Sequence, residues 1–471
     1  MPAARLTSRS IPAELYEMTT SVTPGPSIGL TSILAGLSHA LDLTEGHPRG
    51  HAERACRIAQ ALGAVIGLDA QTQADLVHAT LLKDAGCSSN ALRVYELFGG
   101  PEHGVKRAVW ERDWRKFGEQ LRYALQWTER GGSTVRRFRR LASLATAGPQ
   151  STRELFQIRC ARGAEIARRI GCGQHIAQAI HDMDEHWDGG GHPRGLRDEE
   201  IPLLARIMGL AQVMEIFWGL GGPAAALEVA RTRAGAWFDP AVVLAAESLT
   251  TDSSLWEDLF APDLSTRLLA RMPDGKAVAI DDDRLDQVAA AFALIIDGKS
   301  PYTFDHSTRV SDYAVSIGRQ LALSDEQLRR LRRAGLVHDL GKLTVPNSIL
   351  EHPGTLDEAQ WRVVREHPSF TFDVLARVPV LEELALDAAS HHERMDGKGY
   401  HRGLAGEQLS TTARILAVAD VMDALAADRP YRGGMSPERV MSILNADAGS
   451  HFCPTCVEAC STDLIASAAA A

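Results

Sequence analysis

Residues 336–342 read Leu-Val-His-Asp-Leu-Gly-Lys, and they place a histidine beside an acid with a lysine one turn further on. In a helix, residues three and four apart project to the same side, so His338, Asp339 and Lys342 would gather there. An imidazole and a carboxylate are both metal ligands, and the ammonium group would lie next to the bound cation. A buried histidine bonded to a neighbouring aspartate is the plainer alternative. The stretch therefore predicts a metal site only if other segments supply further ligands.

Five histidines and two aspartates from separate segments form the complete candidate set. They are His306, His338, Asp339, His367, His391, His392 and Asp420. The set has enough nitrogen and oxygen atoms for two adjacent metal ions, with Asp339 able to bridge them. Taken singly, His367 is compatible with a helix end and His391-His392 with a solvated turn. Together these residues favour a binuclear site.

From residue 28 onward, nearly every segment has the periodicity of a helix. Apolar residues recur at helical spacing on both sides of His306, in the sets Leu285, Val288, Ala289, Phe292, Ile295, Ile296 and Val310, Tyr313, Ala314, Ile317, Leu321. Strand-like alternation is scarce, so we expect an all-α fold. Residues 1–27 contain Thr23-Pro24-Gly25-Pro26 and little periodicity, which is typical of a loosely packed N-terminal tail.

Composition limits the classes of partner. The chain has 471 residues, 45% of them hydrophobic and 23% charged, which leaves room for two or three globular domains. Its formal net charge of -10 argues against binding to duplex nucleic acid, for which a basic surface is expected. An anionic substrate would need a locally positive site.

Cysteine content and hydropathy predict a cytoplasmic location. The seven cysteines are odd in number and mostly scattered, unlike a secreted disulfide framework. We see no run approaching the ~18 apolar residues of a membrane span, and no membrane attachment is expected.

Two parts of the chain resemble each other. His51-Ala52-Glu53-Arg54 matches His306-Ser307-Thr308-Arg309 at an offset of 306 − 51 = 255, and the same offset lays Lys83-Asp84 on His338-Asp339. Residues 188–196 match residues 396–404 at an offset of 396 − 188 = 208. We therefore predict a tandem duplication: a first copy at 28–246, a linker at 247–283 and a second copy at 284–471. The drop in offset, 255 − 208 = 47, places an insertion in the first copy at about 88–158.

The two copies differ in chemistry. The positions of His338, His367, His391-His392 and Asp420 are taken in the first copy by Lys83, Arg159, Met183-Asp184 and Gln212. A site that has exchanged ligands for cationic side chains is not suited to two metal ions. We expect the first copy to be a pseudo-enzyme with a structural or regulatory role. Cys453, Cys456 and Cys460 hint at zinc, but the repeat aligns them with Asp239, Val242 and Ala246, so this alternative is not favoured.

The second copy resembles the HD-GYP family, a branch of the HD-superfamily phosphohydrolases that hydrolyses cyclic di-GMP. The resemblance rests on ordered motifs between about residues 286 and 459: Asp305–Val310, His338-Asp339, Glu366-His367-Pro368, His391–Tyr400, Ala419–Leu425 and Arg429-Pro430-Tyr431-Arg432. The namesake triplet departs from the family pattern, because Gly399-Tyr400-His401 has histidine where proline is expected. Loss of proline loosens the loop backbone and puts substrate preference in question.

The resemblance implies a role for each site residue. It assigns one metal to His306, His338, Asp339 and Asp420, and a second metal to Asp339, His367, His391 and His392. Asp339 and Lys342 are then catalytic: a water between the metals attacks the phosphate, and the lysine neutralises a phosphate oxygen. Substrate contacts fall on Tyr400, Asp423, Arg429 and Arg432.

The resemblance also bears on the metals. Some family members hold a third metal through a glutamate at the position of Tyr302, which cannot replace a carboxylate, so we expect two divalent ions. Iron or manganese is what the family implies.

Two other functions remain open. One is a signalling adaptor that binds a cyclic dinucleotide or a partner protein without turnover; the other is an HD phosphohydrolase for another nucleotide phosphoester. The sequence also leaves open a homodimer.

Overall fold

The computed structural model describes residues 29–469, except residues 101, 114–115, 131–132, 274–279, 301–304, 353 and 429–432. Within these limits the regular structure consists of α-helices, short 3-10 helices and two isolated bridges, Ala234 to Phe238 and Ala448 to Phe452. The predicted all-α fold is therefore confirmed.

The first copy and the segment after it contain the helices α1 to α12. Their bounds are α1 Leu30–Thr44, α2 His51–Ile66, α3 Ala70–Leu81, α4 Ala91–Phe98, α5 Glu102–Val109, α6 Phe117–Trp127, α7 Thr134–Arg169, α8 Gln174–Asp182, α9 Leu203–Thr232, α10 Pro240–Ser248, α11 Ser253–Asp258 and α12 Leu264–Ala270, with 3-10 helices η2 Cys87–Asn90, η3 Asp198–Glu200 and η4 Leu249–Thr251. The predicted insertion thus forms α4, α5, α6 and much of α7.

The second copy contains the helices α13 to α23. Their bounds are α13 Asp282–Asp297, α14 His306–Gln320, α15 Asp325–Val337, α16 Asn347–Leu350, α17 Glu358–Arg365, α18 His367–Leu375, α19 Glu382–Ala389, α20 Thr411–Ala426, α21 Pro437–Ala446, α22 Pro454–Glu458 and α23 Thr462–Ala469, with 3-10 helices η6 Leu340–Thr344 and η7 Gly406–Gln408.

Local sequence signals set the ends of the helices around the site. Ser324 caps α15 by accepting the N–H of Gln327, whose side chain accepts the N–H of Ser324 in return. Asp281 and Ser410 cap α13 and α20 in the same way, by accepting an N–H of the first turn. These caps fix where α13, α15 and α20 begin.

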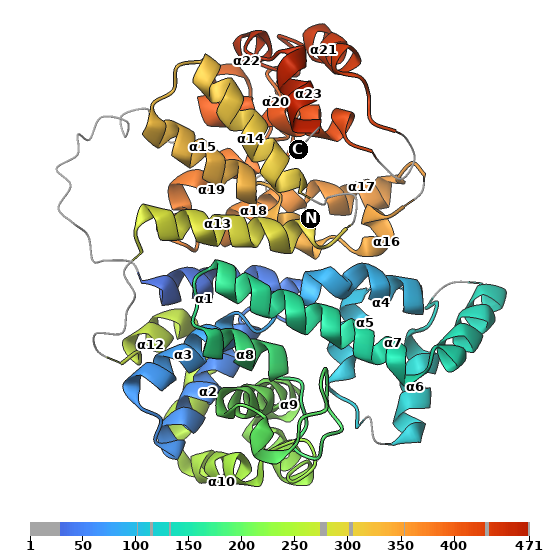
Figure 1. The fold of residues 1–471 in the computed structure, drawn as a ribbon, viewed down its shortest axis with the longest axis vertical. Helices are drawn as coiled ribbons and strands as arrows, with labels where there is room; N and C mark the ends of the chain where they lie inside the picture. Colours follow the sequence, from blue (N-terminus) through green and yellow to red (C-terminus); the bar gives the residue numbers. More distant parts are fainter. Residues whose placement is uncertain are drawn as a thin grey trace, which may run out of the picture.

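The two copies lie one above the other, with α13 of the second copy above α1 and α7 of the first along the junction (Figure 1). Helix α1 of the first copy contacts η6 and α18 of the second, and α13 of the second contacts η2 and α7 of the first. One buried apolar cluster runs through both copies, from Leu30 in α1 to Ala388 in α19. The copies therefore share a hydrophobic core at their junction.

Equivalent hydrogen bonds recur in the two copies at the predicted offsets. Asp42 accepts the N–H of Ala52 at 2.9 Å, and Asp297, at 297 − 42 = 255, accepts the N–H of Ser307. Glu185 accepts N–H groups from residues 194–196, and Glu393, at 393 − 185 = 208, accepts those of residues 402–404. These matched contacts support the predicted duplication, whose exact boundaries stay a prediction.

The segment predicted as a linker is packed on the first copy where it is described. Asp258 in α11 accepts hydrogen bonds from Arg57 of α2, at 2.8 Å, and from Arg267 and Arg271 of its own segment. In α12, Leu268 is buried, and its carbonyl oxygen lies 3.4 Å from the side-chain nitrogen of Gln60. Residues 253–270 therefore belong physically to the first copy.

Helix α9 is long and apolar enough to cross a membrane by length and composition, with 30 residues and a mean hydropathy of 1.4 in its most apolar window. That window is 56% buried, and it carries Arg206 and Glu215, which form ion pairs inside the protein. The backbone leaves helical geometry at Gly221 and Gly222. A buried core helix passes the same test, so α9 is weak evidence for a membrane.

Candidate metal centre

The predicted ligands come together from the ends of helices. His306 is the first residue of α14, His367 is the first residue of α18, and His338-Asp339 follows α15 directly. The pair His391-His392 lies just beyond α19, and Asp420 lies within α20. Each of the seven except His392 is buried. The fold thus converges five segments on one interior point.

Asp339 lies between two groups of histidines. Its Oδ2 atom is 3.4 Å from Nε2 of His306 and 3.4 Å from Nε2 of His338. Its Oδ1 atom is 3.2 Å from Nε2 of His367 and 3.6 Å from Nε2 of His391. One carboxylate therefore faces a different histidine pair with each oxygen, which is the geometry of a bridging ligand.

Asp420 and His392 extend the two groups. Oδ1 of Asp420 lies 3.3 Å from Nε2 of His306 and 3.8 Å from Nε2 of His338, on the first side of Asp339. The His392 ring lies 4.1 Å from the His391 ring, on the second side, and its Nδ1 is 3.8 Å from Oδ2 of Asp420. The structure therefore brings all seven predicted ligands together.

Hydrogen bonds fix the orientation of four imidazole rings. The Nδ1 atoms of His338, His367 and His391 each donate to the carbonyl oxygen three residues earlier, at 2.7, 2.7 and 2.6 Å. Nδ1 of His306 donates to Asp423, at 2.6 Å. With one proton held on Nδ1, each Nε2 is the atom that faces the centre, and it offers a lone pair to a metal once any second proton has left. The neutral Nδ1–H tautomer is the one that a metal requires.

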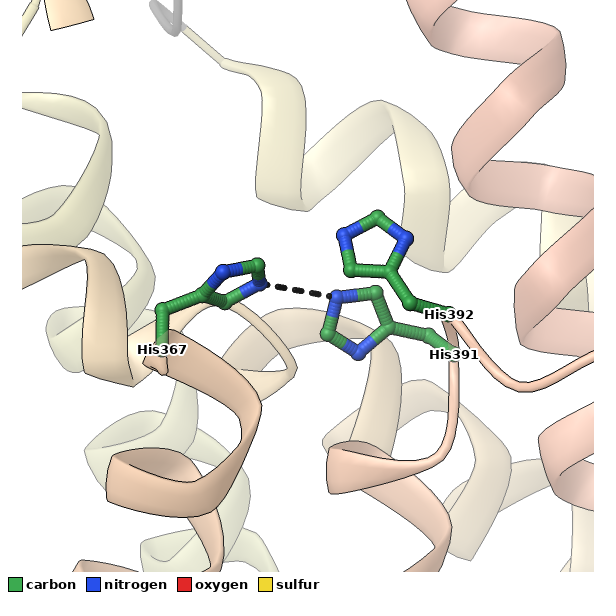
Figure 2. Close-up of side chains that lie close together, drawn as sticks. All are labelled: His367, His391 and His392. Carbon is green, nitrogen blue, oxygen red and sulfur yellow. Dashed lines mark hydrogen bonds between the residues drawn. The ribbon is translucent and has the colours of Figure 1, made fainter. Parts of the chain in front are cut away.

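The centre leaves buried polar atoms without partners. Nε2 of His306, Nε2 of His338 and Oδ1 of Asp339 have no hydrogen-bond partner among the described residues. Figure 2 shows His367 and His391 with their Nε2 atoms directed at one another, 3.2 Å apart. Two lone pairs at this distance repel each other unless a cation or a proton lies near them. The residues therefore fit bound metal ions.

Electrostatics keep the acids of the centre ionised. Burial alone would raise the pKa of Asp339, but His338, Lys342 and His306 hold this pKa well below its usual range. Burial also opposes a charge on His338, yet Asp339 and Asp420 raise its pKa to about 9. In the absence of metal, the carboxylates thus attract protons to His306 and His338, whereas burial lowers the pKa of His367 to about 4.

Lys342 and Tyr400 lie at the edge of the centre. Nζ of Lys342 contacts Oδ2 of Asp339, and the lysine side chain is 22% exposed, so it faces both the buried acid and solvent. The Tyr400 ring lies 4.8 Å from the His392 ring. The guanidinium of Arg365 sits over Tyr400, 5.8 Å from the ring centroid. Arg365 was not among the predicted site residues. The sequence signal that could have indicated it is its position two residues before the predicted ligand His367.

Asp423 contacts residues of the centre. Its predicted contact with substrate stays a prediction; in the structure it is 1% exposed and both of its oxygens are engaged. Oδ2 accepts from His306, and Oδ1 accepts from Arg309 at 2.5 Å. This geometry makes Asp423 a residue that orients His306. The other predicted substrate contacts, Arg429 and Arg432, and the third-metal position Tyr302 lie outside the described residues.

In the first copy, cationic side chains stand where the second copy has histidines. Lys83 contacts Asp84, the counterpart of Asp339, and Arg159 contacts Asp184. Glu45, Asp84 and Cys87 are close enough to form a cation site, but Nζ of Lys106 already lies 3.0 Å from Glu45. These internal cations supply the positive charge that metals would bring.

An all-helical bundle that gathers histidines and aspartates at its helix ends defines a protein of the HD class. The family model described as HD domain matches residues 140–242 and 291–456. The chain belongs to the HD-GYP family of HD-superfamily phosphohydrolases.

Relatives of two kinds are similar to this chain. The 3'3'-cGAMP-specific phosphodiesterase 3 of Vibrio cholerae is 39% identical and covers 91% of this chain and 93% of its own length. The crystal structure of a cyclic GMP-AMP specific phosphodiesterase from V. cholerae has a TM-score of 0.64 and 35% identity, covering 94% of this chain and 98% of its own. The cyclic di-GMP phosphodiesterase response regulator RpfG of Xanthomonas campestris is 36% identical, but covers 42% of this chain and 51% of its own length.

Proposed function

We propose that the chain is a metal-dependent phosphodiesterase that hydrolyses a cyclic dinucleotide at the centre of the second copy. The observation that carries this proposal is the position of Asp339, with one oxygen facing His306 and His338 and the other facing His367 and His391. Such a carboxylate is suited to bridging two cations. The names of relatives over most of the chain supply the reaction class.

The centre would hold two divalent metal ions, and we propose iron or manganese. His306, His338, Asp339 and Asp420 would bind one ion, and Asp339, His367, His391 and His392 the other. When bound, two such ions activate water at neutral pH and neutralise charge on the phosphoryl group. A nitrogen-rich set with two carboxylates favours transition metals over magnesium or calcium.

The residues around the centre would bind and orient the dinucleotide. Lys342 presents its ammonium beside Asp339 and reaches solvent, so it can meet a phosphate oxygen and stabilise the charge that grows there in the transition state. The Tyr400 ring, with Arg365 over it, offers an aromatic face and a positive charge for a base or a phosphate. These groups supply the local positive charge that an acidic chain needs for an anionic substrate.

We propose 3'3'-cGAMP as the preferred substrate and cyclic di-GMP, which the sequence predicted, as the alternative. The relative named for 3'3'-cGAMP matches both copies, whereas the relative RpfG, named for cyclic di-GMP, matches less than half of this chain. His401, where the family triplet has proline, lies in the loop next to Tyr400 and is a candidate for this preference.

The first copy would act as a non-catalytic support for the second. Its Lys83 and Arg159 occupy the positions of metal ligands and pair with Asp84 and Asp184. We also propose a cytoplasmic location, which is supported by the seven cysteines, all of which are free.

Turnover of defined substrates tests the proposal. Wild type and His338→Ala would be incubated with 3'3'-cGAMP, cyclic di-GMP and a mononucleotide phosphoester, and the products separated by chromatography. Cleavage of a cyclic dinucleotide by the wild type alone would support it. Binding without cleavage would favour an adaptor, and cleavage of the mononucleotide alone would favour another HD phosphohydrolase.

A further inference from the structure

The insertion of the first copy reaches into the second copy through one buried carboxylate. Glu102 is the first residue of α5 and is 0% exposed. Both of its oxygens accept the backbone N–H of Asn347, at 3.1 and 3.1 Å. Nζ of Lys299 lies 3.7 Å from the same carboxylate. An acid of the first copy thus binds two residues of the second.

The two partners of Glu102 hold the segment that follows the HD motif. Nζ of Lys299 donates to the carbonyl oxygen of Leu343 at 2.6 Å, and the side-chain nitrogen of Asn347 donates to the carbonyl oxygen of Lys299 at 2.8 Å. Leu343 directly follows Lys342 within η6. Glu102, Lys299 and Asn347, which we call the inter-copy clamp, therefore form one buried network around η6.

The opposite side of η6 is fixed against α18. The N–H of Gly341 donates to the hydroxyl of Thr371 at 2.9 Å, and this hydroxyl donates to the carbonyl oxygen of His338 at 3.0 Å. A Cβ atom at Gly341 would lie 1.9 Å from the carbonyl oxygen of His367, so the two backbones are in close contact. The structure thus holds η6 between α18 on one side and the clamp on the other, in the position where Lys342 contacts Asp339.

Burying the charges of the clamp costs desolvation free energy, so the stability of the junction does not by itself explain the clamp. Burial lowers the pKa of Lys299 to about 8, although Glu102 acts to raise it. Replacing a buried ion pair by apolar residues is often neutral or stabilising. A buried pair that spans two copies is therefore better explained by the geometry that it enforces. The second copy lacks the insertion, so only the first copy contributes an insertion residue to the other copy.

We propose that Glu102 is a positioning residue for the reaction: through Lys299 and Asn347 it holds η6, and with it Lys342, in place beside Asp339. The insertion of the first copy thereby supports catalysis in the second. The expected effect on turnover rests on the proposed function, whereas the hold of the clamp on η6 does not.

The test compares Glu102→Gln in the full chain with Glu119→Gln, a matched control in α6 of the same insertion that pairs with Arg112 and Arg122. We expect kcat for the cyclic dinucleotide to fall about tenfold with KM within about twofold, because a misplaced catalytic group costs rate rather than binding. Metal content should not change. Hydrogen exchange of the amides of residues 343–347 should be about tenfold faster than in the control.

A second variant keeps the inference testable if an unpaired Lys299 prevents folding. The double variant Glu102→Gln with Lys299→Met leaves no buried charge unpaired, and it should show the same loss of kcat and the same faster exchange. Wild-type kcat together with wild-type exchange in a folded variant would overturn the inference. If the wild type itself cleaves no cyclic dinucleotide, the proposed function fails, and the exchange measurement alone decides whether the clamp holds η6.

Discussion

Oδ2 of Asp423 accepts a hydrogen bond from Nδ1 of His306 at 2.6 Å, and the same carboxylate is bound by Arg309. The equivalent residues of the first copy repeat this arrangement: Glu215 contacts His51 and is bound by Arg54. The contact has thus persisted in a copy that has lost most of its metal ligands. It orients a ring in both copies, and Nε2 of each ring has no hydrogen-bond partner among the described residues.

Replacing Asp423 by asparagine should weaken metal binding without removing a ligand. An amide is a poorer acceptor for the Nδ1 proton, so His306 loses both its orientation and part of its basicity. Loss of such an outer partner typically costs 10–100-fold in metal affinity or activity. Titration of the apoprotein with Mn²⁺ would measure this loss of affinity. The control Glu383→Gln, which breaks an exposed ion pair with Arg330, should bind Mn²⁺ as the wild type does. If Asp423→Asn bound Mn²⁺ as tightly as the wild type, the orienting role of Asp423 would be contradicted.

Lys342→Met should reduce turnover while the metal ions remain bound. The ammonium group is not among the proposed ligands, and in the proposed function it lies beside Asp339 where charge would develop on a phosphate oxygen. Removal of one such electrostatic group costs about 10²–10³ in kcat. Steady-state kinetics and metal analysis of the same preparation provide the measurement. A variant that loses its metals, or one that keeps full kcat, would contradict this assignment.

Metal binding should release protons, and its affinity should rise with pH. The pKa of His338 is raised to about 9 by Asp339 and Asp420 against the effect of burial, so at neutral pH the metal-free protein holds a proton that the metal must displace. Apparent affinity should therefore increase as pH approaches about 9. Calorimetric titration with Mn²⁺ in buffers of different ionisation enthalpy would count the protons. A heat that does not depend on the buffer would contradict the expected release.

Lys83→Met in the first copy should lower stability but leave catalysis nearly unchanged. Lys83 is buried and contacts Asp84, so its loss leaves a carboxylate in the interior with fewer partners. Breaking a buried pair costs about 3–5 kcal/mol in free energy of unfolding. Denaturant unfolding and a turnover assay separate the two effects. Loss of activity in the folded variant would contradict the pseudo-enzyme interpretation.

Much of the fold and the ligand set could be predicted because both depend on local patterns. The apolar positions of α13, from Leu285 to Ile296, are buried in the structure as their helical spacing predicted. The seven candidate ligands converge because each occupies a short motif at a helix end or, for Asp420, within a helix. The predicted duplication likewise rests on the offsets of short motifs.

Roles that depend on contacts between distant segments could not be predicted in this way. The hydrogen bond between Asp423 and His306 could not be predicted, since nothing in the helix of Asp423 showed that a residue 117 positions away would engage it. Glu102 had no local signal, because its partner Asn347 lies 245 residues further along the chain. Arg365 comes near Tyr400 only when α17 packs beside the metal centre.

The metal content of protein purified without air or chelators, measured for the wild type and for Asp339→Ala together with cyclic dinucleotide hydrolysis, tests the proposed metal centre directly. We expect about two metal ions per chain and turnover in the wild type, because Asp339 faces both histidine groups. We expect Asp339→Ala to lose both. Turnover by a wild type without metal, or two bound ions and activity in Asp339→Ala, would contradict the proposed metal centre.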